Sequence, residues 1–600
     1  MLRSWITRNS SLLPVYAGVH INHPDVCTAE NSLLAPAWKL RNISIRQNRL
    51  NHQVQSNLSY MKLGGDVPLT DTTVGKLLET AVERWPDREC VVSIDQDVRL
   101  TFSEVLRRAD RLAAGLTKLG IKMGDCLGVW GPNDVEWLIS FMCASRAGLV
   151  LVTINPTYQI DELSYCIQKV NMKAVISPVN FKMQNYPRML LEAKRRCPSL
   201  EHIIIYSKDH VTGTQRFRDV EESASRIETE RVAARQEEIS CHAGNNVQFT
   251  SGTTGMPKAT LLSHRSLVNN SKQGATRSEL ATGQRVCLNV PFFHAFGVIK
   301  GLLCTLHAGT TLVLPARSFN PVKAVEAIVR EKCDIVYGTP TMWINLLDVH
   351  QRLKPPPITL SCGVTGGSPT SPELVKKIKE CFHFDNLKMI YGLTETTAIN
   401  FHSLPNEHNE LTETTVGYLS NHIEVMVVDV NGKAVPFGTP GELWVRGYCT
   451  MKGYWGDEES TKKTFTEDGW LKTGDRFILR SDGYGQIVGR LKDMLIRGGE
   501  NIFPKEVEDM LMTHPSVLEA QVIGAYDKVY GEEVCACVRL RNGASLTKEE
   551  LREYCKKRMA PFKIPRYVEF VDEYPKTASG KVQKYRLRKE LEQKGVIPSQ

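Results

Sequence analysis

The spacing of hydrophobic positions predicts a large α/β region in the first two thirds of the chain. From about residue 70 to residue 392, short apolar runs of strand length alternate with stretches of helical periodicity. The stretch 101–120 is an amphipathic helix that Thr101 or Ser103 can cap. Strands that alternate with helices form parallel sheets covered by helices on both faces. The predicted strands are 125–131, 149–155, 173–177, 203–206, 246–250, 286–290, 310–315, 334–338 and 388–392.

The pattern changes twice after residue 397. Residues 422–435 and 441–447 alternate with period two, and Asn431-Gly432 provides a hairpin turn, so we expect a β-rich subdomain. From about residue 490 to the C-terminus, helical and strand patterns indicate a compact α+β domain. Polar residues interrupt the pattern at 489–493. We therefore predict an N-terminal domain over 65–489 and a small hinged C-terminal domain over 490–600.

The N-terminal segment has a different composition. Residues 1–60 contain two acids, Asp25 and Glu30, and six basic residues, which are Arg3, Arg8, Lys39, Arg41, Arg46 and Arg49. Apolar residues of 2–13 fall largely on one side of a short helix, and no continuous apolar core is present. This is typical of a mitochondrial presequence, so we predict a transit peptide over about 1–50 and a location in the mitochondrial matrix. The alternative is a disordered tail.

Composition narrows the class of protein further. At 600 residues, with 42% hydrophobic and 24% charged residues, the chain is folded and too long for one core. The formal charge of +9 is a small imbalance between 75 basic and 66 acidic residues, without a basic block that would indicate nucleic acid. The sixteen cysteines lack metal-binding spacing, which favours buried free thiols. The longest apolar run, 137–155, contains Arg146 and reads as a helix followed by a strand, so we predict no transmembrane segment.

A loop rich in glycine and threonine follows the strand 246–250. Gly252 and Gly255 allow backbone N–H groups to form a concave nest for anions, hydroxyls add donors, and Lys258 adds a charge. The spacing does not match a Walker P-loop, because Met256-Pro257 separates the second glycine from the lysine. The loop alone predicts a phosphate site, with a surface turn as the alternative.

Five motifs that follow one another along the chain favour the phosphate site over the surface turn. They are "TSGTTGMPK" (250–258), "YGLTETT" (391–397), "GWLKTGD" (469–475), "GRLKDMLIRGGENIFPKEVE" (489–508) and "PKTASGKVQK" (575–584). Together they closely resemble the core motifs of the adenylate-forming superfamily, which includes acyl-CoA synthetases, luciferases and nonribosomal peptide adenylation domains. The resemblance covers roughly residues 65–590 and is strongest to mitochondrial medium-chain acyl-CoA ligases. It implies a fatty acid–CoA ligase that forms acyl-AMP and then acyl-CoA, with ATP, CoA and Mg²⁺.

The resemblance also implies roles for individual residues. The β- and γ-phosphates of ATP are expected on the loop formed by Thr250, Ser251, Gly252, Thr253, Thr254, Gly255, Met256, Pro257 and Lys258. Glu395 is expected to bind Mg²⁺, since a hard cation prefers carboxylate oxygens, and Thr394 to hydrogen-bond the α-phosphate. Adenine is expected on Tyr391 and the backbone of 366–369. The ribose hydroxyls are expected on Asp475, with Arg490 contacting the same ribose or the phosphate. The expected catalytic group is Lys581, with His294 at the mouth of the acyl pocket and the hinge at Lys492.

Each residue has a structural alternative. Glu395 can be an exposed loop acid and Asp475 a turn residue. Tyr391 and His294 can be core residues, Arg490 can form a surface salt bridge, and Lys581 can be a solvated surface charge. Two alternatives for the whole chain also stay open: an adenylating ligase with another acid or acceptor, and a nucleotide-binding regulatory protein without turnover. The sequence does not determine acyl chain length or oligomeric state.

Overall fold

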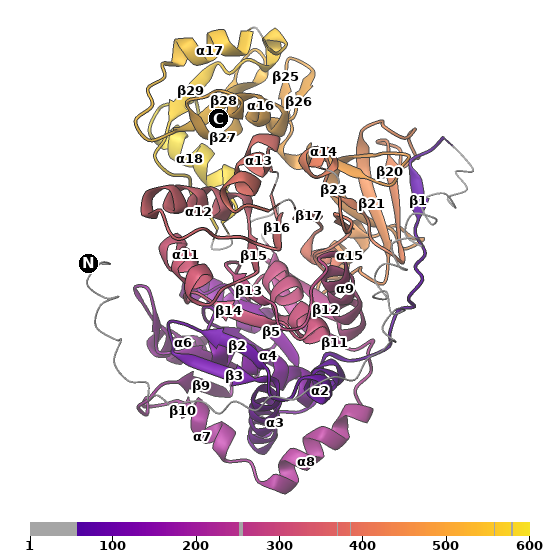
Figure 1. Ribbon diagram of the computed structural model, residues 1–600, viewed down its shortest axis with the longest axis vertical. Coiled ribbons are helices and arrows are strands. Elements are labelled where there is room, and N and C mark those ends of the chain that lie inside the picture. The colour runs from indigo at the N-terminus through magenta and orange to yellow at the C-terminus, as the bar shows by residue number, and fades with distance from the viewer. Residues whose placement is uncertain are drawn as a thin grey trace, which may run out of the picture. The chain divides into compact units, whose positions relative to one another are not determined.

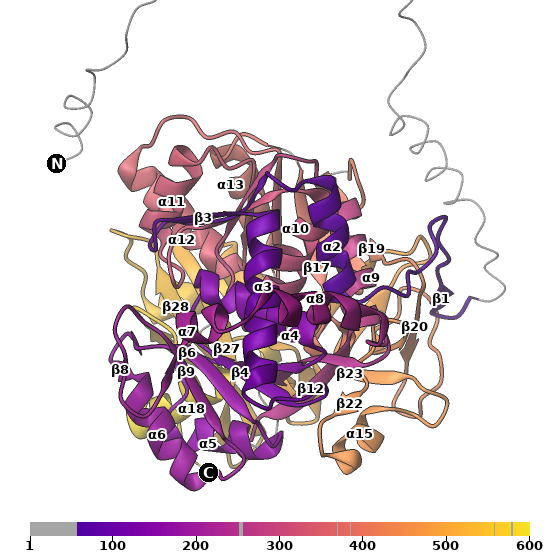
Figure 2. The same cartoon turned by 90° about the horizontal axis from the view of Figure 1, so that it is seen from below.

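The computed structural model describes residues 57–250, 256–368, 370–384, 386–407, 409–556, 558–577 and 580–599. The predicted transit peptide, 1–50, lies outside these ranges, as do Ser251–Gly255 of the loop. Figures 1 and 2 show the described part in two views, and the structure confirms the predicted fold class: parallel-rich sheets with helices, a β-rich subdomain and a C-terminal domain.

The first large sheet has eight strands. In spatial order they are β10 (Gln215–Arg216), β9 (His202–Tyr206), β6 (Ala174–Pro178), β4 (Cys126–Trp130), β5 (Val150–Ile154), β11 (Gly244–Thr250), β12 (Lys258–Ser263) and β22 (Gly453–Tyr454). The strands from β10 to β11 run parallel, whereas β12 and β22 add antiparallel pairs. The loop 251–257 therefore joins two antiparallel neighbours, with Thr250 opposite Lys258.

The second large sheet has nine strands and a parallel centre. In spatial order they are β19 (Tyr418–Leu419), β18 (Phe401–His402), β17 (Leu387–Tyr391), β16 (Cys362–Gly366), β15 (Ile335–Gly338), β13 (Arg285–Leu288), β14 (Thr311–Leu314), β2 (Glu89–Ser93) and β3 (Val98–Thr101). Antiparallel pairs occur only at its two sides. A two-stranded ribbon, β7 (Asn180–Phe181) and β8 (Gln184–Asn185), accompanies these sheets.

Helices cover both faces of the two sheets. One core joins the facing sides through α2 (Val74–Arg84), α3 (Phe102–Lys118), α4 (Val135–Ala147), α9 (His264–Arg277), the π-helix η2 (Gly297–Leu303) and α10 (Cys304–Ala308). The other face of the first sheet packs on α5 (Ile160–Lys169) and α6 (Tyr186–Arg196). The second sheet packs on α11 (Pro321–Arg330), α12 (Pro340–Leu353) and α13 (Pro372–Cys381). Shorter elements are α7 (Phe217–Glu222), α8 (Arg226–Ala234), η1 (Arg235–Glu237) and α14 (Asn409–Thr414).

Local sequence signals explain the best-predicted helices. Thr101, not Ser103, caps α3: its hydroxyl accepts from Glu104 N, and the Glu104 carboxylate accepts from Thr101 N at 2.8 Å. Helix α4 is buried on all sides and lies beside α3 (Figure 2). Its Arg146 is paired with Asp110 and Glu79, which explains how a charge fits into the apolar run 137–155. Within the described residues, no helix combines the length and apolar character needed to cross a membrane.

The predicted β-rich subdomain is a five-stranded antiparallel sheet. Its strands, in order, are β1 (Tyr60–Lys62), β20 (Ile423–Val428), β21 (Gly441–Gly447), β23 (Leu471–Leu479) and β24 (Gly485–Arg490), with α15 (Glu458–Thr464) nearby. Asn431-Gly432 forms the predicted turn, where Asp429 accepts hydrogen bonds from Asn431 N and Lys433 N. Strand β1 lies before residue 65, where the predicted domain begins. The sequence does not predict this strand, because three residues give no periodic signal.

The C-terminal domain is built on a second antiparallel sheet. Its strands are β26 (Glu500–Ile502), β25 (Leu495–Arg497), β28 (Gly531–Leu540) and β27 (Val517–Asp527), with β29 (Tyr567–Phe570) parallel to β28. Its helices are η4 (Leu491–Asp493), α16 (Pro504–Met512), α17 (Lys548–Lys556), η5 (Pro561–Lys563) and α18 (Lys584–Gln593). Figure 1 shows α17 and α18 around this sheet in yellow. Cysteines of the described part are free thiols, all buried except the half-buried Cys381.

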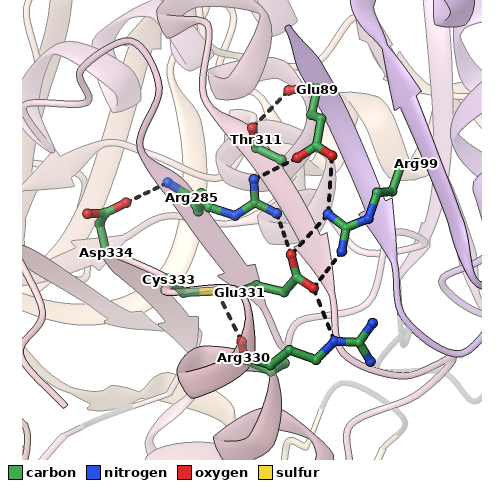
Figure 3. A network of polar contacts seen from close by, with 9 residues as sticks. Glu89, Arg99, Arg285, Thr311, Arg330, Glu331, Cys333 and Asp334 are labelled. Carbon is green, nitrogen blue, oxygen red and sulfur yellow. Dashed lines mark hydrogen bonds and ion pairs between the residues drawn. The ribbon is translucent and has the colours of Figure 1, made fainter. Parts of the chain in front are cut away.

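An ion-pair network around Glu89 and Glu331 links strands at one side of the second sheet, and Arg330 also pairs with Glu331 at 3.5 Å (Figure 3). Arg99 on β3 and Arg285 on β13 both bind Glu89 of β2 and Glu331, which follows α11. The Arg285 contacts are 2.7 Å to Glu89 and 2.6 Å to Glu331. Burial opposes ionisation of Glu331, but Arg99 and Arg285 outweigh it and lower the pKa of this carboxyl. The network ties together strands that are far apart in sequence.

Candidate active site

A cavity of about 2570 Å³ opens where strands of both large sheets end. Parallel strands place ligands at their carboxyl ends, and β5, β11, β16 and β17 all end at this cavity. The cavity also takes residues from the β-rich subdomain and from the C-terminal domain. Most of the predicted site residues line it: Thr250, Pro257, Lys258, His294, Tyr391, Thr394, Glu395, Asp475, Arg490 and Lys581.

Two parts of the predicted site are not among the lining residues. Met256 is half exposed and is not part of the lining, and Ser251–Gly255 lie outside the described residues. Of the segment 366–369, Gly366, Gly367 and Ser368 line the cavity, and Pro369 is not described. Gly367 has a φ of 84°, which a side chain would strain.

Asp475, Arg490 and Tyr391 form one hydrogen-bonded group in the cavity wall. Asp475 and Arg490 face each other on β23 and β24, and Arg490 Nε lies 2.9 Å from Asp475 Oδ1. The Tyr391 hydroxyl donates to Asp475 Oδ2 at 2.7 Å. The Tyr391 ring packs on Phe401 and Phe477, so Tyr391 is at once a core residue and part of the cavity wall. Burial raises the pKa of Asp475 against the opposing charge of Arg490.

One carboxylate oxygen of Asp475 has no aligned hydrogen-bond donor among the described residues. Asp475 is fully buried, yet no donor among the described residues makes a hydrogen bond to Oδ1; the guanidinium at 2.9 Å is close but not aligned. A buried acceptor without a donor is costly unless a ligand satisfies it.

Thr394 and Glu395 lie on a strained turn directly after β17. They open the short helix η3 (Thr394–Thr396), and Thr397 and Ala398 follow with φ of 54° and 71°. Non-glycine residues in this region store strain and occur often at functional sites. The Thr397 hydroxyl donates to Cys449 O at 2.6 Å and holds the turn. Thr394 and Glu395 are both half-buried at the cavity wall.

The loop residues that the structure describes are held from two sides. The Tyr165 hydroxyl donates to Pro257 O at 3.0 Å. Lys258 Nζ lies 4.8 Å from the centre of the Tyr454 ring, and the Tyr454 hydroxyl donates to Glu395 Oε1 at 3.0 Å. The sequence predictions missed Tyr165 and Tyr454; the "GYW" segment at 453–455 is the only local signal for the latter.

Lys581 enters the cavity from the loop before α18. Its backbone N–H donates to Thr577 Oγ1 at 3.0 Å, and its carbonyl accepts from Thr577 N at 2.7 Å. A Cβ on Gly367 would lie 3.8 Å from Lys581 Cε, which places the lysine beside the loop after β16. No described residue forms an ion pair or hydrogen bond with its ammonium. Burial and then Arg490 lower the pKa of Lys581 to about 8.

His294 lies at the start of the helical segment that continues into η2. It lines the cavity, and burial together with the charge of Lys581 lowers its pKa to about 3, so the ring is neutral at pH 7. The cavity therefore brings together Lys258, Arg490 and Lys581 as cations with Glu395 and Asp475 as acids. This arrangement suits a polyanionic ligand with a hydroxylated sugar.

The family model for the AMP-binding enzyme matches residues 78–455, and that for the AMP-binding enzyme C-terminal domain matches 506–581. The chain belongs to the AMP-binding enzyme family. The mitochondrial medium-chain acyl-CoA ligase ACSF2 of Danio rerio is 40% identical over 543 residues, 88% of this chain and 89% of that protein.

Solved structures of AMP-binding enzymes share the fold. The anthranilate CoA ligase AuaEII in complex with anthranoyl-AMP has a TM-score of 0.77 and 26% identity, over 89% of this chain and 99% of that one. ATP-bound MatB from Rhodopseudomonas palustris has a TM-score of 0.76 and 26% identity, over 86% and 99%. These relatives, together with the family match, confirm the predicted class, an AMP-forming acyl-CoA ligase.

Proposed function

We propose that this enzyme joins medium-chain fatty acids to CoA in mitochondria, with Lys581 as the group that promotes acyl-AMP formation. As an AMP-binding acyl-CoA ligase, it converts the acid and ATP into acyl-AMP and pyrophosphate, and CoA then displaces AMP. The observation that carries the proposal is the half-buried Lys581, whose ammonium has no ion-pair partner among the described residues and shares a cavity with Asp475 and Glu395.

The first half-reaction brings a carboxylate to the α-phosphorus of ATP, two groups that repel each other. Lys581 would bind an oxygen of each, and the negative charge that builds on the α-phosphate would strengthen this contact in the transition state. Thr394 would donate a hydrogen bond to the same phosphate. Lys258 and the loop 250–258 would bind the β- and γ-phosphates, so that pyrophosphate leaves as a neutralised group.

The nucleoside would be held by the group around Asp475. The Asp475 carboxylate would accept hydrogen bonds from the ribose hydroxyls, and its partner Arg490 would contact the ribose or the phosphate beside it. Tyr391 would present its ring to adenine while its hydroxyl keeps Asp475 in place. His294, neutral at pH 7, would border the acyl chain without repelling it.

Glu395 fits the Mg²⁺ ion that the family implies. Its Oε1 accepts from Tyr454, and its half-buried carboxylate lines the cavity, so Glu395 would hold the metal through carboxylate oxygen, the ligand that a hard cation prefers. When bound, Mg²⁺ would neutralise phosphate charge. The chain's own contribution is to hold this carboxylate toward the phosphates.

In the second half-reaction, the thiol of CoA would have to reach the position that Lys581 occupies in the first. We propose that the C-terminal domain turns about Lys492, withdraws Lys581 and presents residues 497–501. Lys492 lies in the exposed turn η4, between the end of β24 and the start of β25, where few contacts would have to break.

Oxygen tracing tests the acyl-AMP route. With fatty acid labelled by ¹⁸O in the carboxylate, one labelled oxygen should appear in AMP after turnover, because the carboxylate oxygen attacks the α-phosphorus. Label in inorganic phosphate, or ADP as the product, would overturn the route. A ligase with another acceptor would transfer label to AMP but would not consume CoA.

The mitochondrial location is tested by truncation. A chain lacking residues 1–50 should keep its activity and lose import, since the segment is proposed to carry targeting only. Import of the truncated chain, or a cytosolic full-length chain, would contradict the proposal. Protease protection in intact mitochondria and in mitoplasts distinguishes the matrix from the intermembrane space.

A further inference from the structure

Tyr454 lies between the two groups proposed to hold the charged ends of Mg·ATP. Its hydroxyl donates to Glu395 Oε1 at 3.0 Å, and its ring faces Lys258, whose Nζ lies 4.8 Å from the ring centre. All three side chains line the same cavity. Lys258 has no ion-pair partner among the described residues, so the aromatic ring is the group that the structure places against its charge.

The local fold fixes Tyr454 through its backbone. Strand β22 pairs antiparallel with β12, and Tyr454 is opposite Thr260, two residues after Lys258. Tyr454 N donates to Thr461 Oγ1 at 2.9 Å. A Cβ at the preceding Gly453 would lie 3.0 Å from Thr461 Cγ2, and its φ of 143° also disfavours a side chain. Tyr454 is therefore set by the sheet and by the helix α15 rather than by the ligand.

The same short segment also holds the backbone of Glu395. Met451 N donates to Glu395 O at 2.8 Å, three residues before Tyr454 reaches the carboxylate. Glu395 is thus held at its carbonyl and at one carboxylate oxygen by a segment that is more than fifty residues away in sequence. Burial, followed by the charge of Glu395, raises the pKa of Tyr454 and keeps its hydroxyl a donor.

We propose that Tyr454 is a positioning residue that presets Glu395 and Lys258 for Mg·ATP. Its hydroxyl donates to one oxygen of Glu395 and would leave the other oxygen for the metal, while its ring lies against Lys258. The inference rests on the proposed function of this site, but it concerns metal–nucleotide binding and not the identity of the acid. Partners that orient a metal ligand typically change metal affinity about ten- to a hundredfold when removed.

Two substitutions separate the hydroxyl from the ring. Tyr454→Phe removes the hydroxyl only, and we expect about a tenfold loss of affinity for Mn²⁺ in the presence of ATP, measured by electron paramagnetic resonance. The KM for ATP at saturating Mn²⁺ should change little. Tyr454→Leu also removes the ring below Lys258 and should raise that KM as well. Tyr574→Phe is the matched control, since it removes a buried hydroxyl that donates to Glu519 O and Cys537 O, and it should leave Mn²⁺ binding unchanged.

A double mutant decides whether Tyr454 acts through Glu395. Glu395→Gln should itself lose Mn²⁺ affinity, and adding Tyr454→Phe to it should cause no further loss. Additive losses, or normal Mn²⁺ binding by Tyr454→Phe, would overturn the proposal. Melting temperatures are measured for every variant, and binding is measured well below the transition, so that instability is not read as lost affinity. If the ¹⁸O experiment fails while these Mn²⁺ results hold, the positioning role stands and the proposed ligation falls.

Discussion

Replacing Lys581 by alanine should separate the two half-reactions of this enzyme. We propose that the ammonium is needed while negative charge builds on the α-phosphate and that it no longer faces the site after the proposed rotation. We therefore expect Lys581→Ala to lose acyl-AMP synthesis and to retain acyl transfer from supplied acyl-AMP to CoA at close to the wild-type rate.

The size of the loss follows from the environment of Lys581. Burial and Arg490 lower its pKa from 10.5 to about 8, so the free enzyme holds the ammonium at a cost of about 3 kcal/mol. An anion bound beside it recovers that energy. A preorganised contact of this kind contributes about 10²–10³ in rate, which is about 2.7–4 kcal/mol. We expect a loss of at least 10² in the adenylation rate.

The assay measures the two steps separately. Pyrophosphate release in a single turnover reports adenylation, and thioester formation from presynthesised acyl-AMP reports transfer. Lys576→Ala is the matched control, because this lysine of the same loop pairs with Glu519 at 3.6 Å and does not line the cavity. Equal losses in both steps for Lys581→Ala would refute the rotating-domain account and assign Lys581 to a fixed site or to folding.

Three further predictions follow from the same contacts. Lys258→Ala should lower kcat/KM for ATP, with a loss of transition-state stabilisation of roughly 2–4 kcal/mol. An unchanged kcat/KM in steady-state kinetics would show that the loop does not bind phosphate. In the wild type, kcat/KM for ATP should fall as pH rises through about 8, because free Lys581 then loses its proton, and Lys581→Arg should not show that fall. Glu331→Gln should lower the melting temperature by a few degrees at pH 7. Because the folded protein lowers the pKa of Glu331, this carboxylate stabilises the fold above its ordinary pKa of 4.5, and the stabilisation is lost as the pH falls through the pKa of the folded state. The difference in melting temperature between the wild type and Glu331→Gln should therefore shrink in acid. A difference that stays constant with pH in calorimetry would contradict this.

The alternation of apolar runs was sufficient to predict the α/β fold, because each parallel strand is buried on both faces and reads as a short apolar block. The helix α3 was predicted together with its cap, since both depend on neighbours within four residues. Order across the sheets was not predictable in this way. The pairing of β1 with β20 joins residues more than 360 positions apart, and the network of Glu89, Arg99, Arg285 and Glu331 depends on strand order.

The candidate active site was also predictable only in part from the sequence. Motif resemblance named Asp475, Arg490, Glu395 and Lys581, and the structure brings them to one cavity, although their roles stay predictions. The motifs could not reveal the pairing of Asp475 with Arg490 and Tyr391 or the contacts of Tyr454, because both depend on side-chain geometry between segments. Tyr391 shows why a single role is too simple, since its core packing and its hydrogen bond to Asp475 occur together.

The most direct test of the central claim is AMP formation by the purified enzyme with ATP, CoA and saturated fatty acids of increasing length. We expect AMP, pyrophosphate and acyl-CoA to form in equal amounts and only when CoA is present, with the highest kcat/KM for medium-chain acids. Formation of AMP without any acyl-CoA would point to a different acceptor, and the absence of acid-dependent turnover at every chain length would contradict the account.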